Sequence, residues 1–291
     1  MNGIFSALMG AFRADGALSE AGMRALVRHN IDVCGVDGLY VNGSTGEIFL
    51  MTQKMRQSAL RIAASEAQGK VKLIAHVGVL CMEEIHAMTA LAADLGYDAV
   101  SAVTPFYYKY TVDEIIRYYE MIARRSPLPV VAYYIPHLSG VSMSADALCR
   151  ILDVPGVAGI KFTSNDLFAL ERLRALRPDK TIYAGFDEML LPALALGADG
   201  AIGSTYNVIG HWAKQLAARM AAGDLAGART VQQKMNAVIT ALIESGLFGT
   251  LKALCRQYDL PVGDCLPPMS PTTDAQNQAA TRIKDMIARG I

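Results

Sequence analysis

Short hydrophobic runs alternate with longer amphipathic segments along the first part of the chain. Runs that are apolar at nearly every position predict strands buried on both faces, and the segments between them repeat their apolar positions at helical spacing. Glycine or proline lies at most of the junctions, where such residues end strands and helices. We expect strands at residues 3–9, 38–42, 72–78, 99–104, 130–135, 159–164, 181–186 and 200–204.

Capping residues mark several of the helices between these strands. Ser19 is an expected N-cap for a helix that stops before Gly35, and Thr111 with Glu114 forms a capping box for a helix that reaches Arg125. Parallel strands need helical crossovers, and eight strands joined in this way close into a barrel. The pattern therefore predicts the α/β class and a (β/α)8 TIM barrel with a C-terminal helical extension.

The extension is predicted because no strand is expected beyond about residue 210. Helical spacing continues there, with stops near Gly223, Gly246 and the pair Pro267-Pro268. We divide the chain into a barrel catalytic domain at residues 1–222 and a helical extension at residues 223–291. No low-complexity linker separates the two, so the extension is expected to pack on the barrel.

The composition narrows the class of partner. The 291 residues are 52% hydrophobic and 19% charged, which suits a heavily buried protein and argues against disorder. Lysine plus arginine and aspartate plus glutamate number 27 each, so no net charge attracts nucleic acid or a membrane surface. We expect neither as a partner.

Cysteine and histidine spacing indicates neither a disulfide framework nor a metal site. The five cysteines are odd in number and contain no Cys-x-x-Cys pair, and the five histidines show no ligand spacing. His76 is interpreted as a core histidine. The N-terminus lacks a basic segment followed by a long apolar run. We expect a cytoplasmic enzyme that uses no metal.

Lys161 is the anomaly in this pattern, because it interrupts the apolar run at residues 159–164. Along a strand it shares one face with Gly159 and Thr163, while Ile160 and Phe162 share the other. An apolar pocket would lower the pKa of its amine, which is normally about 10.4, and a neutral lysine is the usual nucleophile for Schiff-base formation with a ketone. The alternatives are an edge lysine that reaches solvent or a core lysine paired with an acid.

The active face of such a barrel lies where the strands end and the helices begin. Side chains with useful chemistry follow several of the predicted strands and are expected around one mouth: Ser44, Thr45, Tyr107, Tyr133, Lys161, Asp187 and Ser204. The small residues at 43–47 lack the lysine of a phosphate loop, so a carboxylate site at a helix N-terminus fits them better. A tight turn without a ligand is the alternative.

Tyr133 and Tyr134 point to opposite sides of the strand at residues 130–135. Tyr133 has the parity of Val131, and in the barrel order its strand is next to the strand of Lys161. Its phenol could therefore move a proton on a substrate bound to Lys161. A buried tyrosine with a satisfied hydroxyl is the alternative.

Together these motifs resemble the pyruvate-dependent Schiff-base lyases, the family that includes dihydrodipicolinate synthase and N-acetylneuraminate lyase. Residues 43–47 are similar to its pyruvate-carboxylate loop, residues 133–136 to its tyrosine strand and residues 159–163 to its Schiff-base strand. The resemblance implies that Lys161 forms the imine without any external cofactor, that Ser44 and Thr45 hold the carboxylate, and that Tyr133 transfers the proton. It also implies that Tyr107 enters the site from a neighbouring subunit of a homotetramer and completes a relay with Ser44.

Residues 100–108, 166–172, 185–188 and 203–207 are similar to the N-acetylneuraminate lyase subgroup. This resemblance implies cleavage of a sugar acid to pyruvate, with Asp187, Glu188 and Ser204 on the hydroxylated tail. Thr163 and Gly185 are expected at the substrate as well. An aldolase or dehydratase for another sugar acid, such as a 2-keto-3-deoxy-sugar acid, is the alternative, and a silent binding protein is a more distant one.

Three positions depart from the family pattern. Leu138 stands where dihydrodipicolinate synthases usually carry an arginine for a second carboxylate, which argues against that activity. The first strand ends in Met9-Gly10-Ala11-Phe12, where Thr-Pro-Phe is usual. His137 is a less typical neighbour of the mouth and could alter pH dependence or acyl preference.

Overall fold

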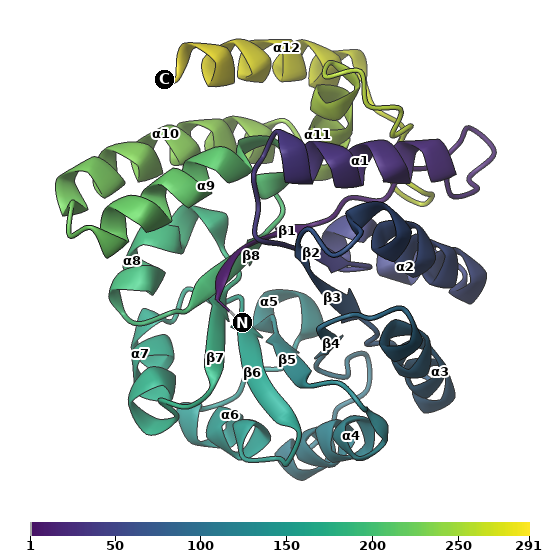
Figure 1. Ribbon diagram of the computed structural model, residues 1–291, viewed down its shortest axis with the longest axis vertical. Coiled ribbons are helices and arrows are strands. Elements are labelled where there is room, and N and C mark those ends of the chain that lie inside the picture. Colours follow the sequence, from purple (N-terminus) through teal and green to yellow (C-terminus); the bar gives the residue numbers. More distant parts are fainter. Residues whose placement is uncertain (1) are drawn as a thin grey trace.

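The computed structural model describes residues 2–291 and confirms the predicted closed parallel barrel (Figure 1). Eight strands pair in chain order and β1 closes the barrel against β8. Their bounds are β1 Gly3–Ala7, β2 Gly38–Val41, β3 Lys72–His76, β4 Ala99–Val103, β5 Val130–Tyr134, β6 Val157–Phe162, β7 Thr181–Ala184 and β8 Gly200–Gly203. The predicted strands run one or two residues past these C-terminal ends, because the chain leaves the sheet there to form the mouth.

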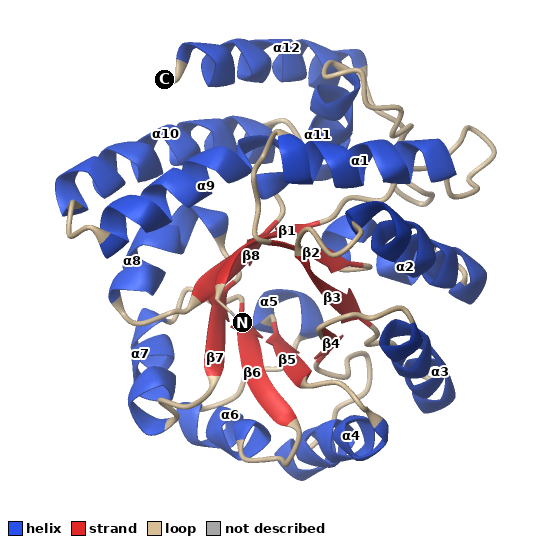
Figure 2. Ribbon diagram, in the orientation of Figure 1, coloured by secondary structure: helices blue, strands red, loops and turns tan. Residues whose placement is uncertain are grey.

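Helices surround the strands, as the blue ring around the red barrel in Figure 2 shows. After β1 to β8 in turn come α1 Glu20–Asp32, α2 Gln53–Ala67, α3 Met82–Asp94, α4 Val112–Arg125, α6 Ala145–Leu152, α7 Leu167–Leu176, α8 Leu190–Ala195 and α9 Tyr206–Ala221. The loops contain the short helix α5 Pro136–Ser139 and the 3-10 turns η1 Ser44–Gly46, η2 Ile48–Leu50 and η3 Asp187–Met189.

The predicted caps set the starts of these helices. The Ser19 hydroxyl accepts a hydrogen bond from Gly22 N–H at the start of α1. At α4 the Thr111 side chain accepts from Glu114 N–H while the Glu114 carboxylate accepts from Thr111 N–H, which is the expected capping box.

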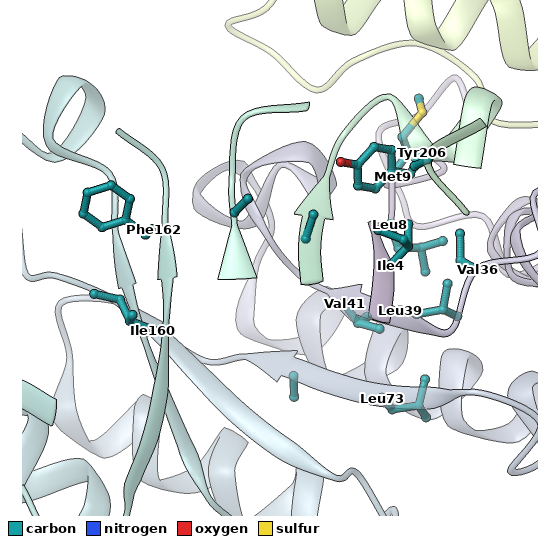
Figure 3. Packing of buried hydrophobic residues seen from close by; sticks show 14 of the residues in the cluster. Ile4, Leu8, Met9, Val36, Leu39, Val41, Leu73, Ile160, Phe162 and Tyr206 are labelled. Carbon is teal, nitrogen blue, oxygen red and sulfur yellow. The ribbon is translucent and has the colours of Figure 1, made fainter. Parts of the chain in front are cut away.

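Strand alternation separates two hydrophobic clusters. Residues such as Phe5, Tyr40 and Tyr183 fill the barrel interior. Ile160 and Phe162 belong to the larger cluster between the barrel and its helices, part of which Figure 3 shows. Because these two residues point outward, Lys161 between them must point inward.

The C-terminal segment folds into α10 Leu225–Glu244, α11 Leu247–Arg256 and α12 Asp274–Arg289. In Figure 1, α10 lies beside α9, and it also contacts η3 at the barrel mouth. The extension therefore packs on the barrel. The expected boundary between residues 222 and 223 falls in the turn between α9 and α10, and the division into two domains stays a prediction.

Within residues 2–291, no single helix is long and apolar enough to cross a membrane. Helices α10 and α11 reach the length and apolar composition of a membrane span only when taken together, and the two are bent by 110° relative to each other.

Candidate active site

Lys161 projects into the upper barrel interior and is only 4% exposed. Its strand pairs it with Tyr133 of β5 on one side and with Tyr183 of β7 on the other. Its Nζ lies 4.2 Å from the Tyr133 ring centroid and 4.5 Å from that of Tyr40. The amine is thus held between two aromatic faces instead of reaching bulk solvent. In the described part of the chain no acidic side chain forms a salt bridge with it.

A cavity of about 210 Å³ opens above this lysine. Of the site residues predicted from the sequence, only Tyr107 does not line it. The others do: Ser44, Thr45, Tyr133, Lys161, Thr163, Gly185, Asp187, Glu188 and Ser204. Helices α10 and α11 contribute an apolar part of the cavity wall, which consists of Ile239, Ile243, Leu247 and Phe248. One side of the cavity can therefore bind hydroxyl and carboxylate groups while the other excludes water.

The loop after β2 brings two hydroxyl side chains to this cavity. Gly46 N–H donates to Gly43 O at 3.0 Å and closes the turn η1, which carries Ser44 and Thr45. The Thr45 and Ser204 hydroxyl oxygens are 2.6 Å apart, so the ends of β2 and β8 are joined directly. A hydroxyl that faces this cavity can donate a hydrogen bond to a carboxylate. Carboxylate binding by this loop stays a prediction.

Tyr133 faces the interior as its parity predicts, whereas Tyr134 packs outside the barrel. The Tyr133 ring meets the His76 ring edge to face, with centroids 5.8 Å apart and an interplanar angle of 86°. His76 Nε2 accepts a hydrogen bond from Val103 N–H at 3.1 Å. Burial, helped by the charge of Lys161, lowers the pKa of His76 to about 3. His76 is therefore a neutral core residue, as expected, and its ring packs against that of Tyr133.

Asp187 is a buried acid at the start of η3. Its Oδ2 accepts from the Thr205 amide at 2.8 Å and from the Thr205 hydroxyl at 2.6 Å. Burial raises the pKa of Asp187 to about 6, although the two bonds from Thr205 oppose that change. Glu188, whose charge also raises this pKa, lines the same cavity. The two acids can accept hydrogen bonds from hydroxyl groups.

Two glycines allow these polar groups to approach the cavity. A Cβ added at Gly203 would lie 1.8 Å from Asp187 Oδ1, and one at Gly185 would lie 1.8 Å from Thr163 Oγ1. Neither position can carry a side chain without moving its neighbour. Position 185 therefore requires glycine, because any side chain there would overlap Thr163.

Tyr107 is the sequence-predicted residue that does not join the cavity. It is 84% exposed, and it lines a different surface hollow of about 590 Å³ that does not contain Lys161. Its φ of +77° turns the loop after β4 outward, where its ring meets Tyr108 edge to face. Tyr107 therefore does not line the Lys161 cavity of its own chain. Its contribution to a neighbouring subunit stays a prediction.

Tyr40 and the cavity wall formed by α10 and α11 were not predicted from the sequence. Tyr40 could have been found, because on β2 it lies three residues before Gly43, where the small-residue loop begins, and it faces inward. Nothing in the sequence indicated that α10 and α11 form part of the cavity wall, because amphipathic spacing does not show which end of the barrel a helix covers. His137, which departs from the family pattern, lines the cavity and stacks on Phe186 with ring centroids 5.4 Å apart. It therefore lies at the mouth of the barrel.

The chain is similar to known proteins over nearly its whole length. The family model for the dihydrodipicolinate synthetase family matches residues 1–286. An N-acetylneuraminate lyase from Clostridium perfringens is 45% identical over 283 residues, which are 97% of this chain and 98% of the relative. The CdNal structure from Clostridium difficile in complex with mannosamine is 43% identical with a TM-score of 0.96, and each chain is covered to 98%. N-acetylneuraminate lyase from Fusobacterium nucleatum complexed with pyruvate is 41% identical with a TM-score of 0.93, covering 98% of this chain and 96% of that one.

Proposed function

Because the chain belongs to the dihydrodipicolinate synthetase family, we propose that it cleaves N-acetylneuraminate to pyruvate and N-acetylmannosamine and also catalyses the reverse condensation. The observation that carries this proposal is the buried Lys161 amine between Tyr40 and Tyr133, at the base of a cavity lined with hydroxyl and acidic groups. The lyase names of relatives that are 45% identical over nearly the whole chain support the choice of substrate.

The chemistry begins with an imine. The Lys161 amine attacks C2 of the open-chain keto acid and water leaves, which gives a protonated imine. This cation withdraws the electron pair of the C3–C4 bond as that bond breaks, so an enamine of pyruvate forms. Protonation of the enamine at C3 and hydrolysis of the imine then release pyruvate and free lysine. The reaction needs no external cofactor.

Two groups around the amine complete the reaction centre. Ser44 and Thr45 donate hydrogen bonds to the carboxylate next to C2, which keeps C2 within reach of Lys161. Tyr133, whose ring lies beside the amine, takes the proton of the C4 hydroxyl as the aldehyde forms. Tyr107 from a neighbouring subunit of a homotetramer extends the relay through Ser44.

The remaining polar residues recognise the sugar tail. Asp187, Glu188 and Ser204 accept hydrogen bonds from its hydroxyl groups, while Thr163 and Gly185 line the route between the imine and the tail. Two acids repel a second carboxylate, and Leu138 offers it no positive charge. The site thus favours a neutral polyol chain over the dicarboxylate product of a dihydrodipicolinate synthase.

The reaction is assigned to the cytoplasm. All five cysteines, at positions 34, 81, 149, 255 and 265, are free thiols. Free thiols are usual in a reducing compartment.

Product analysis tests the function. The protein is incubated with N-acetylneuraminate, and pyruvate and N-acetylmannosamine are measured together with borohydride trapping of pyruvate on Lys161. Stoichiometric release of both products is expected. Trapping without cleavage of N-acetylneuraminate, combined with turnover of 2-keto-3-deoxy-sugar acids, would favour the alternative aldolase. Trapping without turnover of any sugar acid would indicate a keto-acid-binding protein.

A further inference from the structure

A fully buried ion pair joins the hydroxyl loop to the C-terminal extension. Lys252 Nζ of α11 lies 3.0 Å from Glu47 Oε1, and both side chains are 1% exposed. Burying two charges is costly unless their other polar partners are in place. Glu47 directly follows the turn that carries Ser44 and Thr45, so the pair anchors the end of that turn without lining the cavity.

Glu47 has a backbone conformation that its surroundings must enforce. Its φ is +61°, in the left-handed region that a residue with a Cβ rarely adopts. At this point η1 ends and η2 begins, so the direction of the whole loop depends on one residue. Its carboxylate accepts from Leu266 N–H at 2.6 Å in addition to its pairing with Lys252. Both partners come from the C-terminal region.

Lys252 also binds the loop that follows β1. Its ammonium donates to Gly10 O at 2.7 Å and to Asp264 O at 3.3 Å, and it lies 4.4 Å from the Phe12 ring centroid. One charged nitrogen therefore holds the loops after β1 and β2 in fixed positions relative to each other.

This arrangement also accounts for glycine at position 10. A Cβ added at Gly10 would lie 2.5 Å from the Phe12 ring and 3.1 Å from Gly46 O. Phe12 cannot easily yield, because it packs beneath the Lys252 ammonium. The unusual end of the first strand is thus matched to the ion pair.

We propose that Glu47 and Lys252 are positioning residues, which hold the Ser44 and Thr45 hydroxyls where they bind the carboxylate of the keto acid. This deepens the proposed function and rests on it for the identity of the ligand. Neither residue lines the cavity of Lys161, so neither touches the substrate. The C-terminal extension thereby controls affinity for the keto acid from behind the loop.

The test compares Lys252→Met with Arg174→Met, each in the full-length protein. Arg174 pairs with Asp199 at the opposite end of the barrel, so its loss reports on general destabilisation. Carboxylate contacts act on the ground state and the transition state alike, so their loss raises KM and leaves kcat nearly unchanged. We expect Lys252→Met to raise the KM for pyruvate in condensation about tenfold, with kcat changed less than about twofold. Arg174→Met should leave KM unchanged.

A second variant and a second measurement guard against misfolding and against a wrong choice of substrate. Glu47→Gln combined with Lys252→Met leaves no unpaired buried charge, and its KM should be no higher than that of Lys252→Met alone. Hydrogen exchange of the peptide at residues 43–50 needs no substrate, and it should be about tenfold faster in either variant. Unchanged KM and unchanged exchange in the double variant would overturn the proposal. Faster exchange in the variants, together with no trapping of pyruvate by the unaltered protein, would instead reject the proposed function and retain the positioning role of Glu47 and Lys252.

Discussion

Lys161 and Tyr133 are direct partners in the register of β5 and β6, and the lysine nitrogen lies 4.2 Å from the centre of the tyrosine ring. Strand pairing alone brings the proposed nucleophile and the proposed acid and base together. No loop has to close to assemble them. The two residues can be tested separately, because Lys161 is proposed to form the covalent bond and Tyr133 to move a proton.

Lys161→Arg should abolish both trapping and turnover. A guanidinium stays protonated at all accessible pH values and cannot attack a ketone. Borohydride reduction with pyruvate, followed by peptide mass analysis, should label Lys161 in the unaltered protein and nothing in the variant. Lys180→Met is the matched control, since Lys180 binds Val157 O at the other end of the same strand. A label on any other lysine would refute the assignment.

Tyr133→Phe should fold and lose roughly 10²- to 10⁴-fold in kcat, the usual contribution of a general acid or base. Tyr134→Phe is the control on the next residue, because its hydroxyl points outward and accepts from Met143 N–H at 3.1 Å. That control should retain activity. Near-normal cleavage by Tyr133→Phe would show that the residue only packs in the core.

Asp187→Ala should lower kcat/KM for N-acetylneuraminate roughly 10- to 100-fold, the equivalent of one lost hydrogen bond to a charged group. Trapping of pyruvate on Lys161 should change little, because pyruvate lacks the hydroxylated tail. The ratio of the two effects is the measurement. Equal losses would place Asp187 at the reaction centre, and efficient condensation of pyruvate with aspartate semialdehyde would indicate a different subgroup.

The raised pKa of Asp187 predicts a pH dependence of stability. A carboxyl with a pKa of about 6 in the folded protein and 3.8 as its model value holds its proton more tightly when folded. The folded state therefore binds more protons than the unfolded state between these values, and stability falls as pH rises from about 4 to about 6. Asp187→Asn removes this titration. The unfolding free energy of the variant relative to the parent should rise by on the order of 3 kcal/mol between pH 4 and pH 7, because each pKa unit corresponds to about 1.4 kcal/mol. Urea denaturation at both pH values measures the difference, and a gap that does not change with pH would contradict the pKa.

The exposed Tyr107 predicts complementation between subunits. Tyr107→Phe retains Lys161, and Lys161→Met retains Tyr107, so a mixed oligomer contains sites with both groups only if Tyr107 crosses the interface. Tyr107→Phe should be impaired because it lacks the relay hydroxyl, and Lys161→Met because it lacks the amine. Refolding the two variants together should recover activity above that of either one refolded alone. No recovery, despite mixed oligomers that native mass spectrometry detects, would reject the shared site.

The sequence by itself determined the barrel and the inward direction of its chemistry. Apolar runs at strand length, separated by helical spacing, leave few alternatives to a closed parallel sheet. The period of two predicts which residues share a strand face with Lys161 and with Tyr133, and the closed barrel shows that both faces are interior. Barrel topology could also place four further residues at one mouth, because the C-terminal ends of parallel strands meet at one face of the barrel. These are Ser44, Thr45, Asp187 and Ser204.

Tertiary structure alone decided which side chains meet across large distances in the chain. The Lys252–Glu47 pair joins α11 to the loop after β2, and nothing in the local pattern of either segment indicates the other. The exposure of Tyr107 and the wall formed by α10 and α11 depend on how loops and helices pack on the finished barrel. Periodicity reports which face of an element is buried, whereas the partner on that face is selected by the shape and charge of the whole fold.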